Sequence, residues 1–176
     1  ERRSPVFDWA HARPMGSVRL LRDYPQIWGL VAVVFLANFA HFVYPSTFVL
    51  FADASFGWKE KEAGYVLAVV GVLSVIVNAV LIGKMVKRLG ERRAILVGLS
   101  CGVVGFLIYG FAGTGWMFLA GLPISALWAI ATPSTQALIT QQVGPEVQGR
   151  IQGALSGLVS LAGIAAPALF AGSFGY

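Results

Sequence analysis

Charged side chains are scarce in this sequence, and five long stretches of it contain none at all. Only 12% of the 176 residues are Asp, Glu, Lys or Arg, about half the share of a typical soluble domain. Each stretch reaches or approaches the roughly 20 mostly apolar residues that a helix needs to cross a bilayer. The sequence therefore predicts an all-α, polytopic membrane helix bundle, with spans at Ile27–Phe51, Ala63–Ile82, Ala94–Ala112, Trp116–Thr140 and Ile151–Phe174.

Other absences exclude whole classes of function. The single cysteine, Cys101, lies inside a predicted span, so no internal disulfide is possible. The spans contain no pair of acidic residues and no cluster of metal-ligand residues, and glycine patterns for phosphate or dinucleotide binding are missing. We therefore expect no enzyme, no catalytic residue, and no bound metal or cofactor. The net charge of +5 would suit a nucleic acid, but the basic residues flank the spans, so we expect the lipid bilayer as a partner instead.

The positive residues are distributed unequally between the two ends of the predicted spans. Eleven of the 13 Lys and Arg precede the first span or follow the second and fourth, whereas only Lys59 and Lys61 lie at the opposite side. Positively charged loops tend to stay in the cytoplasm. Residues 1–26 and the 83–93 loop are therefore predicted to be cytoplasmic, in a multi-pass protein of the cell inner membrane. Residues 1–26 are interpreted as a linker, and residues 27–176 as a transmembrane helical domain.

The first span carries several polar side chains within a predicted membrane segment. Asn38, His41 and Tyr44 follow one another at steps of three, which places them on one helix face. Polar side chains in hydrocarbon usually face a bundle interior or a cavity, and histidine can change charge near neutral pH. His41 is therefore a candidate for binding a proton or a substrate group. The alternative is a neutral histidine that is hydrogen-bonded to Asn38 or to a neighbouring helix. Pro45 is expected to kink this span.

The fourth and fifth spans add further candidates for the same pocket. Trp128 lies deep within its span, away from the interface where tryptophan is common. Such a ring can stack on a flat or cationic ligand, and packing against lipid or the bundle core is the alternative. Gln136 follows on the polar side of the same span, and Ser156 belongs to a polar stripe of the next. The predicted substrate-pocket residues are Asn38, His41, Tyr44, Trp128, Gln136 and Ser156.

Glycine recurs every fourth residue near the start of the fifth span, at Gly149, Gly153 and Gly157. Small residues at this spacing let membrane helices approach closely. The pattern predicts a helix-packing face, and the alternative is a contact that slides during a conformational change.

The segment GKMVKRLGERR, from Gly83 to Arg93, resembles a signature of the major facilitator superfamily. In that family the signature joins the second and third helices of each six-helix half. The resemblance implies that its glycines allow a tight turn, and that its arginines cap helix ends and pair with acids of neighbouring helices. It assigns a cytoplasmic gate to Gly83, Arg88, Gly90, Arg92 and Arg93. Lys87 replaces the usual acidic residue, which fits the more variable C-terminal copy of the signature.

A set of motifs in the same order is similar to the tetracycline-resistance class of drug/proton antiporters. The matching segments are RLGERRA at 88–94, QAL at 136–138, QVGPE at 142–146, QGRIQG at 148–153 and AP at 166–167. The resemblance implies the C-terminal half of the major facilitator fold, with the five spans as helices seven to eleven. On this interpretation the domain is incomplete, because helix twelve is missing or begins at Tyr176.

The resemblance further implies a part of a secondary active transporter. The expected activity is proton-coupled efflux of a tetracycline-like or other amphipathic drug by alternating access. The expected partners are a small-molecule substrate and the N-terminal half of the same transporter, and a proton gradient is the expected coupling source. Because a fold does not dictate a function, the alternative is a non-transporting membrane scaffold or receptor built on the same fold.

Overall fold

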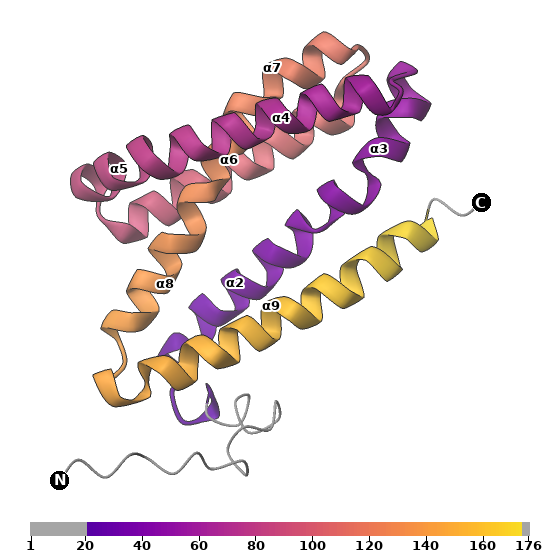
Figure 1. Cartoon of the computed structure of the whole chain (residues 1–176). Coiled ribbons are helices and arrows are strands. Elements are labelled where there is room, and N and C mark those ends of the chain that lie inside the picture. Colours follow the sequence, from indigo (N-terminus) through magenta and orange to yellow (C-terminus); the bar gives the residue numbers. More distant parts are fainter. Residues whose placement is uncertain (1–20, 174–176) are drawn as a thin grey trace, which may run out of the picture.

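A computed structural model describes residues 21–173, without the side chains of residues 45, 46 and 171–173. The described residues form helices joined by short turns (Figure 1). Residues 1–20 of the predicted linker lie outside the described range. In chain order the elements are η1 (Pro25–Ile27), α2 (Trp28–His41), α3 (Val43–Phe56), α4 (Glu60–Ile76), η2 (Val77–Leu81), α5 (Ile82–Leu89), α6 (Glu91–Phe111), α7 (Gly115–Ala126), η3 (Leu127–Ile130), α8 (Ala131–Gln141) and α9 (Pro145–Ser173).

Four continuous helical runs within the described residues are long and apolar enough to cross a membrane. They coincide with the second to fifth predicted spans, so the prediction of an all-α membrane bundle is confirmed. The runs are Glu60–Leu89, Glu91–Phe111, Gly115–Gln141 and Pro145–Phe170.

The first predicted span, Ile27–Phe51, is not one continuous helix. It is divided between α2 and α3, and Phe42 lies between them. Proline at position 45 has no N–H to donate to the carbonyl of His41, one helical turn earlier. The break therefore falls one turn before Pro45, where the missing hydrogen bond belongs. Each part is a shorter apolar helix, so the polar face around His41 lies beside a bend in the chain.

Two other runs change their helical pitch midway. Between α4 and α5 the chain forms a π-helical turn, η2, and within it the Nδ2 of Asn78 donates to the Ser74 carbonyl at 2.8 Å. Between α7 and α8 it forms a 3₁₀ turn, η3. Pro133 cannot donate to the carbonyl of Ala129 in that turn. Such local changes of pitch turn the side chains that follow toward a different direction.

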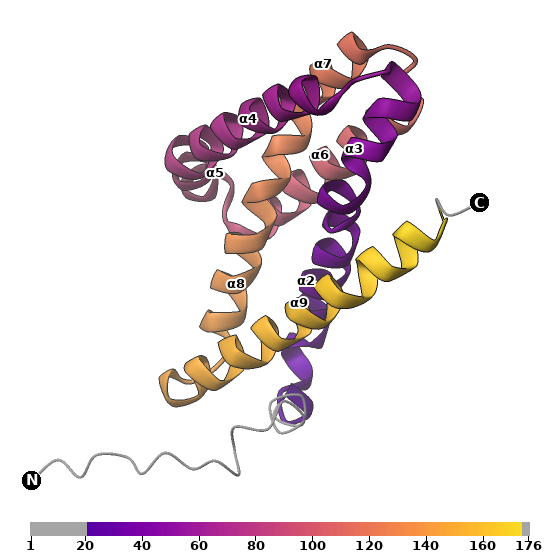
Figure 2. The ribbon, with the colours of Figure 1, turned by 45° about the vertical axis from the view of Figure 1, so that its right-hand side comes forward.

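The helices are arranged in two groups, which Figures 1 and 2 show from two sides. In one group α6 packs along α7, η3 and α8, and in the other α9 lies beside α2 and α3. A turn at residues 112–114 joins α6 to α7, where the Thr114 hydroxyl accepts the N–H of Met117 at 3.4 Å. This short connection makes α6 and α7 antiparallel neighbours.

Glycines permit the close approach of α6 to its neighbours. A Cβ at Gly98 would lie 2.9 Å from the backbone nitrogen of Ala131, and one at Gly105 would lie 2.6 Å from the Cβ of Ser125. Both distances are shorter than real Cβ contacts, so only glycine fits without a shift of the neighbouring backbone. Small residues therefore bring membrane helices together in this protein, and the residues that do so lie on α6.

The packing predicted at Gly149, Gly153 and Gly157 is not formed among residues 21–173. A Cβ at any of these three positions would meet nothing within 4 Å. The cause is the orientation of α9, which buries Ile151 and Leu155 in a core shared with α2 and α8. The glycine stripe consequently lies on a free side of α9.

The predicted 83–93 loop is helical on both sides of a single residue. Helix α5 continues to Leu89, α6 begins at Glu91, and Gly90 joins them with a φ of 75°. A residue with a side chain rarely adopts this backbone conformation, so the turn depends on Gly90. Gly83, by contrast, lies within α5, where a Cβ would meet nothing within 4 Å, and the turn does not require it.

Candidate functional site

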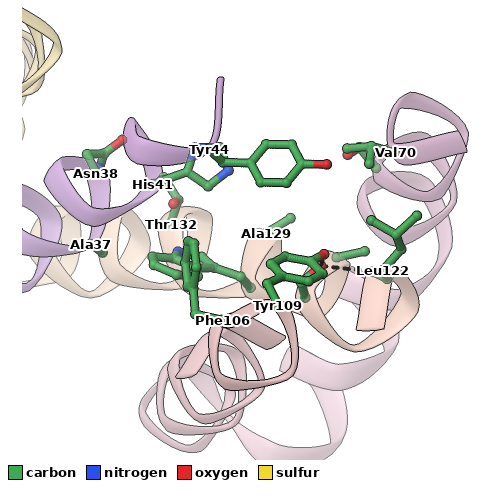
Figure 3. A pocket seen from close by; sticks show the side chains of 14 residues that line it. Ala37, Asn38, His41, Tyr44, Val70, Phe106, Tyr109, Leu122, Ala129 and Thr132 are labelled. Carbon is green, nitrogen blue, oxygen red and sulfur yellow. Dashed lines mark hydrogen bonds between the residues drawn. The ribbon is translucent and has the colours of Figure 1, made fainter. Parts of the chain in front are cut away.

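A pocket with several polar side chains in its wall lies between the broken first span and the helices opposite it. Its volume is about 210 Å³. The bend between α2 and α3 forms one side, and side chains of α4, α6, α7, η3 and α8 form the other. Figure 3 shows His41 and Tyr44 on the first side, across from Phe106 and Tyr109. Its polar or aromatic lining residues are Asn38, His41, Tyr44, Ser74, Phe106, Tyr109, Ser125, Trp128 and Thr132.

Four of the six predicted pocket residues meet here, namely Asn38, His41, Tyr44 and Trp128. Gln136 and Ser156 do not line this pocket, and both side chains are exposed elsewhere. Gln136 lies on α8 after the change of pitch at η3, and Ser156 is on the face of α9 that turns away from α2. The prediction of a shared pocket therefore does not extend to these two residues.

His41 lies against an aromatic wall. Its ring centroid is 5.8 Å from that of Trp128, at an interplanar angle of 71°, and Trp128 in turn meets Phe106 edge-on at 5.2 Å. The alternative, a hydrogen bond between His41 and Asn38, is not formed, and the Asn38 Nδ2 instead donates to the Val34 carbonyl at 2.7 Å. Within residues 21–173 the imidazole has no hydrogen-bond partner, and its exposed side chain borders the pocket.

Tyr44 contributes a second polar group without a partner. Its ring stacks on Phe48, with the centroids 5.0 Å apart, and its buried hydroxyl has no hydrogen-bond partner in the described structure. A buried hydroxyl without a partner carries a free-energy cost that a ligand can remove by hydrogen bonding. The neighbouring Tyr109 hydroxyl is different, because it is hydrogen-bonded to the Ser125 hydroxyl, which donates to the Leu122 carbonyl at 3.0 Å.

Sequence reasoning did not select Phe106 and Tyr109 for the pocket, although both rings line it. They lie on α6, whose apolar sequence resembles that of any membrane helix. The glycines at 98, 102 and 105 are the sequence signal that could have identified the packed side of α6, because they mark the side that faces the other helices. Tyr109 continues that side one turn later and is buried.

The arginines assigned to a gate gather around the turn at Gly90. Arg88 lies in the last turn of α5, and Arg92 and Arg93 lie in the first turn of α6. All three are exposed, and none forms an ion pair with another described residue. Their charges are therefore available to groups outside residues 21–173.

One polar contact ties this turn to the end of the fourth span. The Nε2 of Gln141 donates to both carboxylate oxygens of Glu91, at 2.8 and 3.0 Å. Glu91 is the first residue of α6, and Gln141 is the last residue of α8. The contact therefore links the start of α6 to the end of α8, two helix ends that are far apart in the sequence.

We expect Gln141→Ala to lower the free energy of unfolding by about 1 kcal/mol, since an exposed hydrogen bond contributes little more. Glu91→Ala should cost a similar amount. If the two side chains act together, the double variant should lose no more than the larger single loss. Thermal midpoints of the four proteins in one detergent would measure this, and additive losses would contradict the contact.

Comparison with known proteins identifies the bundle. A model of the Major Facilitator Superfamily matches residues 2–167. The chain belongs to the major facilitator superfamily. This match confirms the family resemblance inferred from the sequence motifs. It also confirms the prediction of a multi-pass membrane protein from a family of transporters.

Several relatives of this chain are named tetracycline resistance proteins. The class C tetracycline resistance protein of Escherichia coli is 32% identical over 154 residues, covering 88% of this chain and 39% of the relative. The class G protein of Vibrio anguillarum is 32% identical over 155 residues, with the same coverage of 88% and 39%. Hippocampus abundant transcript-like protein 1 of Rattus norvegicus is 27% identical over 162 residues, covering 92% of this chain and 32% of the relative.

This chain therefore spans less than half the length of these relatives. No solved structure matches it. The pocket around His41 is thus a site within one part of a major facilitator protein.

Proposed function

We propose that this chain is part of a secondary active transporter of the cell inner membrane. The proposed activity is efflux of a tetracycline-like or other amphipathic drug, driven by a proton gradient. Transport would proceed by alternating access, in which this half moves against the N-terminal half around a mid-membrane site. The proposal includes no enzymatic step, no bound cofactor and no nucleic-acid partner.

The observation that carries the proposal is the pair of unpartnered polar groups at the pocket. The His41 imidazole and the Tyr44 hydroxyl lack hydrogen-bond partners among the described residues, and both border one cavity. A polar group within a membrane span carries a free-energy cost, so its presence there points to a functional role. The names of the tetracycline-resistance relatives supply the proposed substrate class.

Four residues of the pocket have proposed roles. The Trp128 ring offers a flat face for a ring of the substrate. Asn38 and Tyr44 supply hydrogen-bonding groups, and His41 binds either a polar substrate group or the transported proton. The lining helices belong to one half, so the N-terminal half would close the pocket from the other side.

The gate and the glycine stripe have proposed roles at the contact between halves. Arg88, Arg92 and Arg93 would pair with acids of the N-terminal half when the cytoplasmic side is closed. Their lack of ion pairs within residues 21–173 supports this role. The stripe from Gly149 to Gly157 would pack or slide against the same partner, since it contacts nothing in the described chain.

The test is a drug-induced collapse of the proton gradient in everted membrane vesicles that contain the intact protein. We expect addition of a tetracycline, or of another amphipathic drug, to reduce the gradient. His41→Ala should slow this response about tenfold or more, the usual cost of removing one hydrogen bond to a charged group. His41→Gln preserves a hydrogen-bonding side chain but cannot titrate, so it separates the two roles of His41.

Each outcome has a distinct meaning. A response restored in His41→Gln would assign substrate contact to His41, and a response lost in both variants would assign proton transfer. A full response in His41→Ala would remove His41 from the pathway. No response to any drug, with the protein present in the membrane, would contradict drug efflux and favour a non-transporting scaffold or receptor.

A further inference from the structure

A second pocket lies at the end of the bundle where α4 begins and α6 turns into α7. Its volume is about 630 Å³. Four aromatic side chains line it, together with a single charged group, the carboxylate of Glu62. The aromatic lining residues are Phe56, Trp58, Tyr65 and Trp116.

The indole of Trp58 is held firmly in this wall. Its ring centroid lies 5.0 Å from that of Phe56 and 6.0 Å from that of the buried Phe118. Gly115 lies directly against the indole, because a Cβ there would be 3.0 Å from its Cε2 atom. The pocket therefore has a preformed aromatic face on one side.

The carboxylate of Glu62 is also fixed in position. Its Oε2 accepts the backbone N–H of Lys59 at 3.1 Å, at the start of α4. Glu62 has no ion pair with any of residues 21–173, and its other oxygen has no hydrogen-bond partner there. A carboxylate that forms no ion pair and lies beside aromatic faces is an environment that favours a cationic group.

The residues around the pocket are of the kinds that meet lipid at a membrane interface. Trp116 is 82% exposed and Tyr65 is 66% exposed, and both rings lie near the ends of membrane spans, where such residues meet lipid head groups. Tyr65 also begins an exposed apolar stripe on α4 that continues through Val69, Val72 and Ile76. This stripe runs from the pocket along the span and offers a surface for an acyl chain.

We propose that this pocket binds the head group of a zwitterionic membrane lipid that carries an ammonium group. The ammonium group would lie between Glu62 and the aromatic rings. Lys59 and Lys61, both exposed at the same helix start, supply positive charge for the lipid phosphate. The two lysines do not line the pocket itself, but they flank Glu62 at the start of α4, and both signs of charge beside an apolar stripe match a zwitterionic lipid better than a purely cationic drug.

The test is lipid retention by the intact protein in native mass spectrometry. The protein in detergent is given equal amounts of phosphatidylethanolamine and phosphatidylglycerol, which differ in the ammonium group. We expect phosphatidylethanolamine to be retained preferentially. Glu62→Gln still accepts the Lys59 N–H, because glutamine also caps helices, but it lacks the charge. It should reduce the preference about fivefold, as suits a partly exposed charge contact.

Glu60→Gln is the matched control. It removes the same charge from the same helix turn, but Glu60 does not line the pocket, so the preference should stay unchanged. A double variant, Tyr65→Leu with Trp116→Leu, keeps apolar volume while removing two aromatic faces, and it should also weaken the preference.

Three results would overturn the proposal. One is equal retention of both lipids by the unaltered protein, and another is an equal effect of Glu60→Gln and Glu62→Gln. The third is displacement of phosphatidylethanolamine by an equal amount of dodecyltrimethylammonium, a cation without a phosphate. That result would assign the pocket to cationic amphiphiles in place of a lipid.

Discussion

Replacing Gly102 with leucine is expected to prevent α6 from packing against η3 and to leave little folded protein. Gly102 is buried, and a Cβ there would lie 2.8 Å from Cδ2 of Trp128. The indole has little room to move, because Phe106 and His41 lie against it. Overpacking of this kind costs about 1–3 kcal/mol, and more where the neighbour is rigid. The measurement is the yield of monodisperse protein in detergent and its thermal midpoint.

Gly110→Leu provides the control for this prediction. Gly110 is in the same helix, is exposed, and would present its Cβ to open space. It therefore tests the effect of adding a leucine to α6 without the collision. Equal yields and midpoints for the two variants would show that α6 does not pack closely against Trp128.

The second large effect is expected for Trp128→Ala, which removes the aromatic wall of the pocket. The variant loses the edge contacts with His41 and Phe106, each worth roughly 0.5–1.5 kcal/mol beyond the area buried. Under the proposed function, the drug-induced collapse of the proton gradient should slow about tenfold or more. The measurement is the vesicle assay, normalised to the amount of folded protein.

Trp128→Phe is the conservative comparison. It keeps a flat aromatic ring beside His41, so it should retain a larger part of the response than alanine does. A full response in Trp128→Ala would show that the substrate does not pass through this pocket. A loss of folded protein in both variants would instead assign Trp128 to packing between α6 and η3.

Much of the membrane topology was predictable because the cost of placing charge in hydrocarbon acts residue by residue. Charged side chains mark both ends of the second span and the start of the third, whereas the uncharged turn at residues 112–114 is marked by glycine and threonine. Local chemistry also predicted the kink near Pro45 and the glycine-dependent turn, which proved to rest on Gly90 and not on Gly83. These features depend on neighbours in the sequence and need no knowledge of the fold.

The pocket was only partly predictable. Helical periodicity predicted that Asn38, His41 and Tyr44 share one face, and all three line the pocket although the break at Phe42 divides them between α2 and α3. It could not determine that His41 meets Trp128, or that Gln136 and Ser156 lie elsewhere. Those outcomes depend on how α8 and α9 are rotated about their own axes, and the pitch change at η3 alters that rotation for α8.

The two glycine repeats show the same difference between what a sequence pattern predicts and what the tertiary structure decides. Repeats at Gly98, Gly102 and Gly105 and at Gly149, Gly153 and Gly157 are similar as patterns, yet only the first set brings helices of residues 21–173 into close contact. By itself, the sequence determined that this is a helical membrane protein of the major facilitator superfamily, because hydrophobic length and local motifs are properties of single segments. Only the tertiary structure decided which faces meet and which polar groups remain unpaired, because these depend on contacts between segments far apart in the chain.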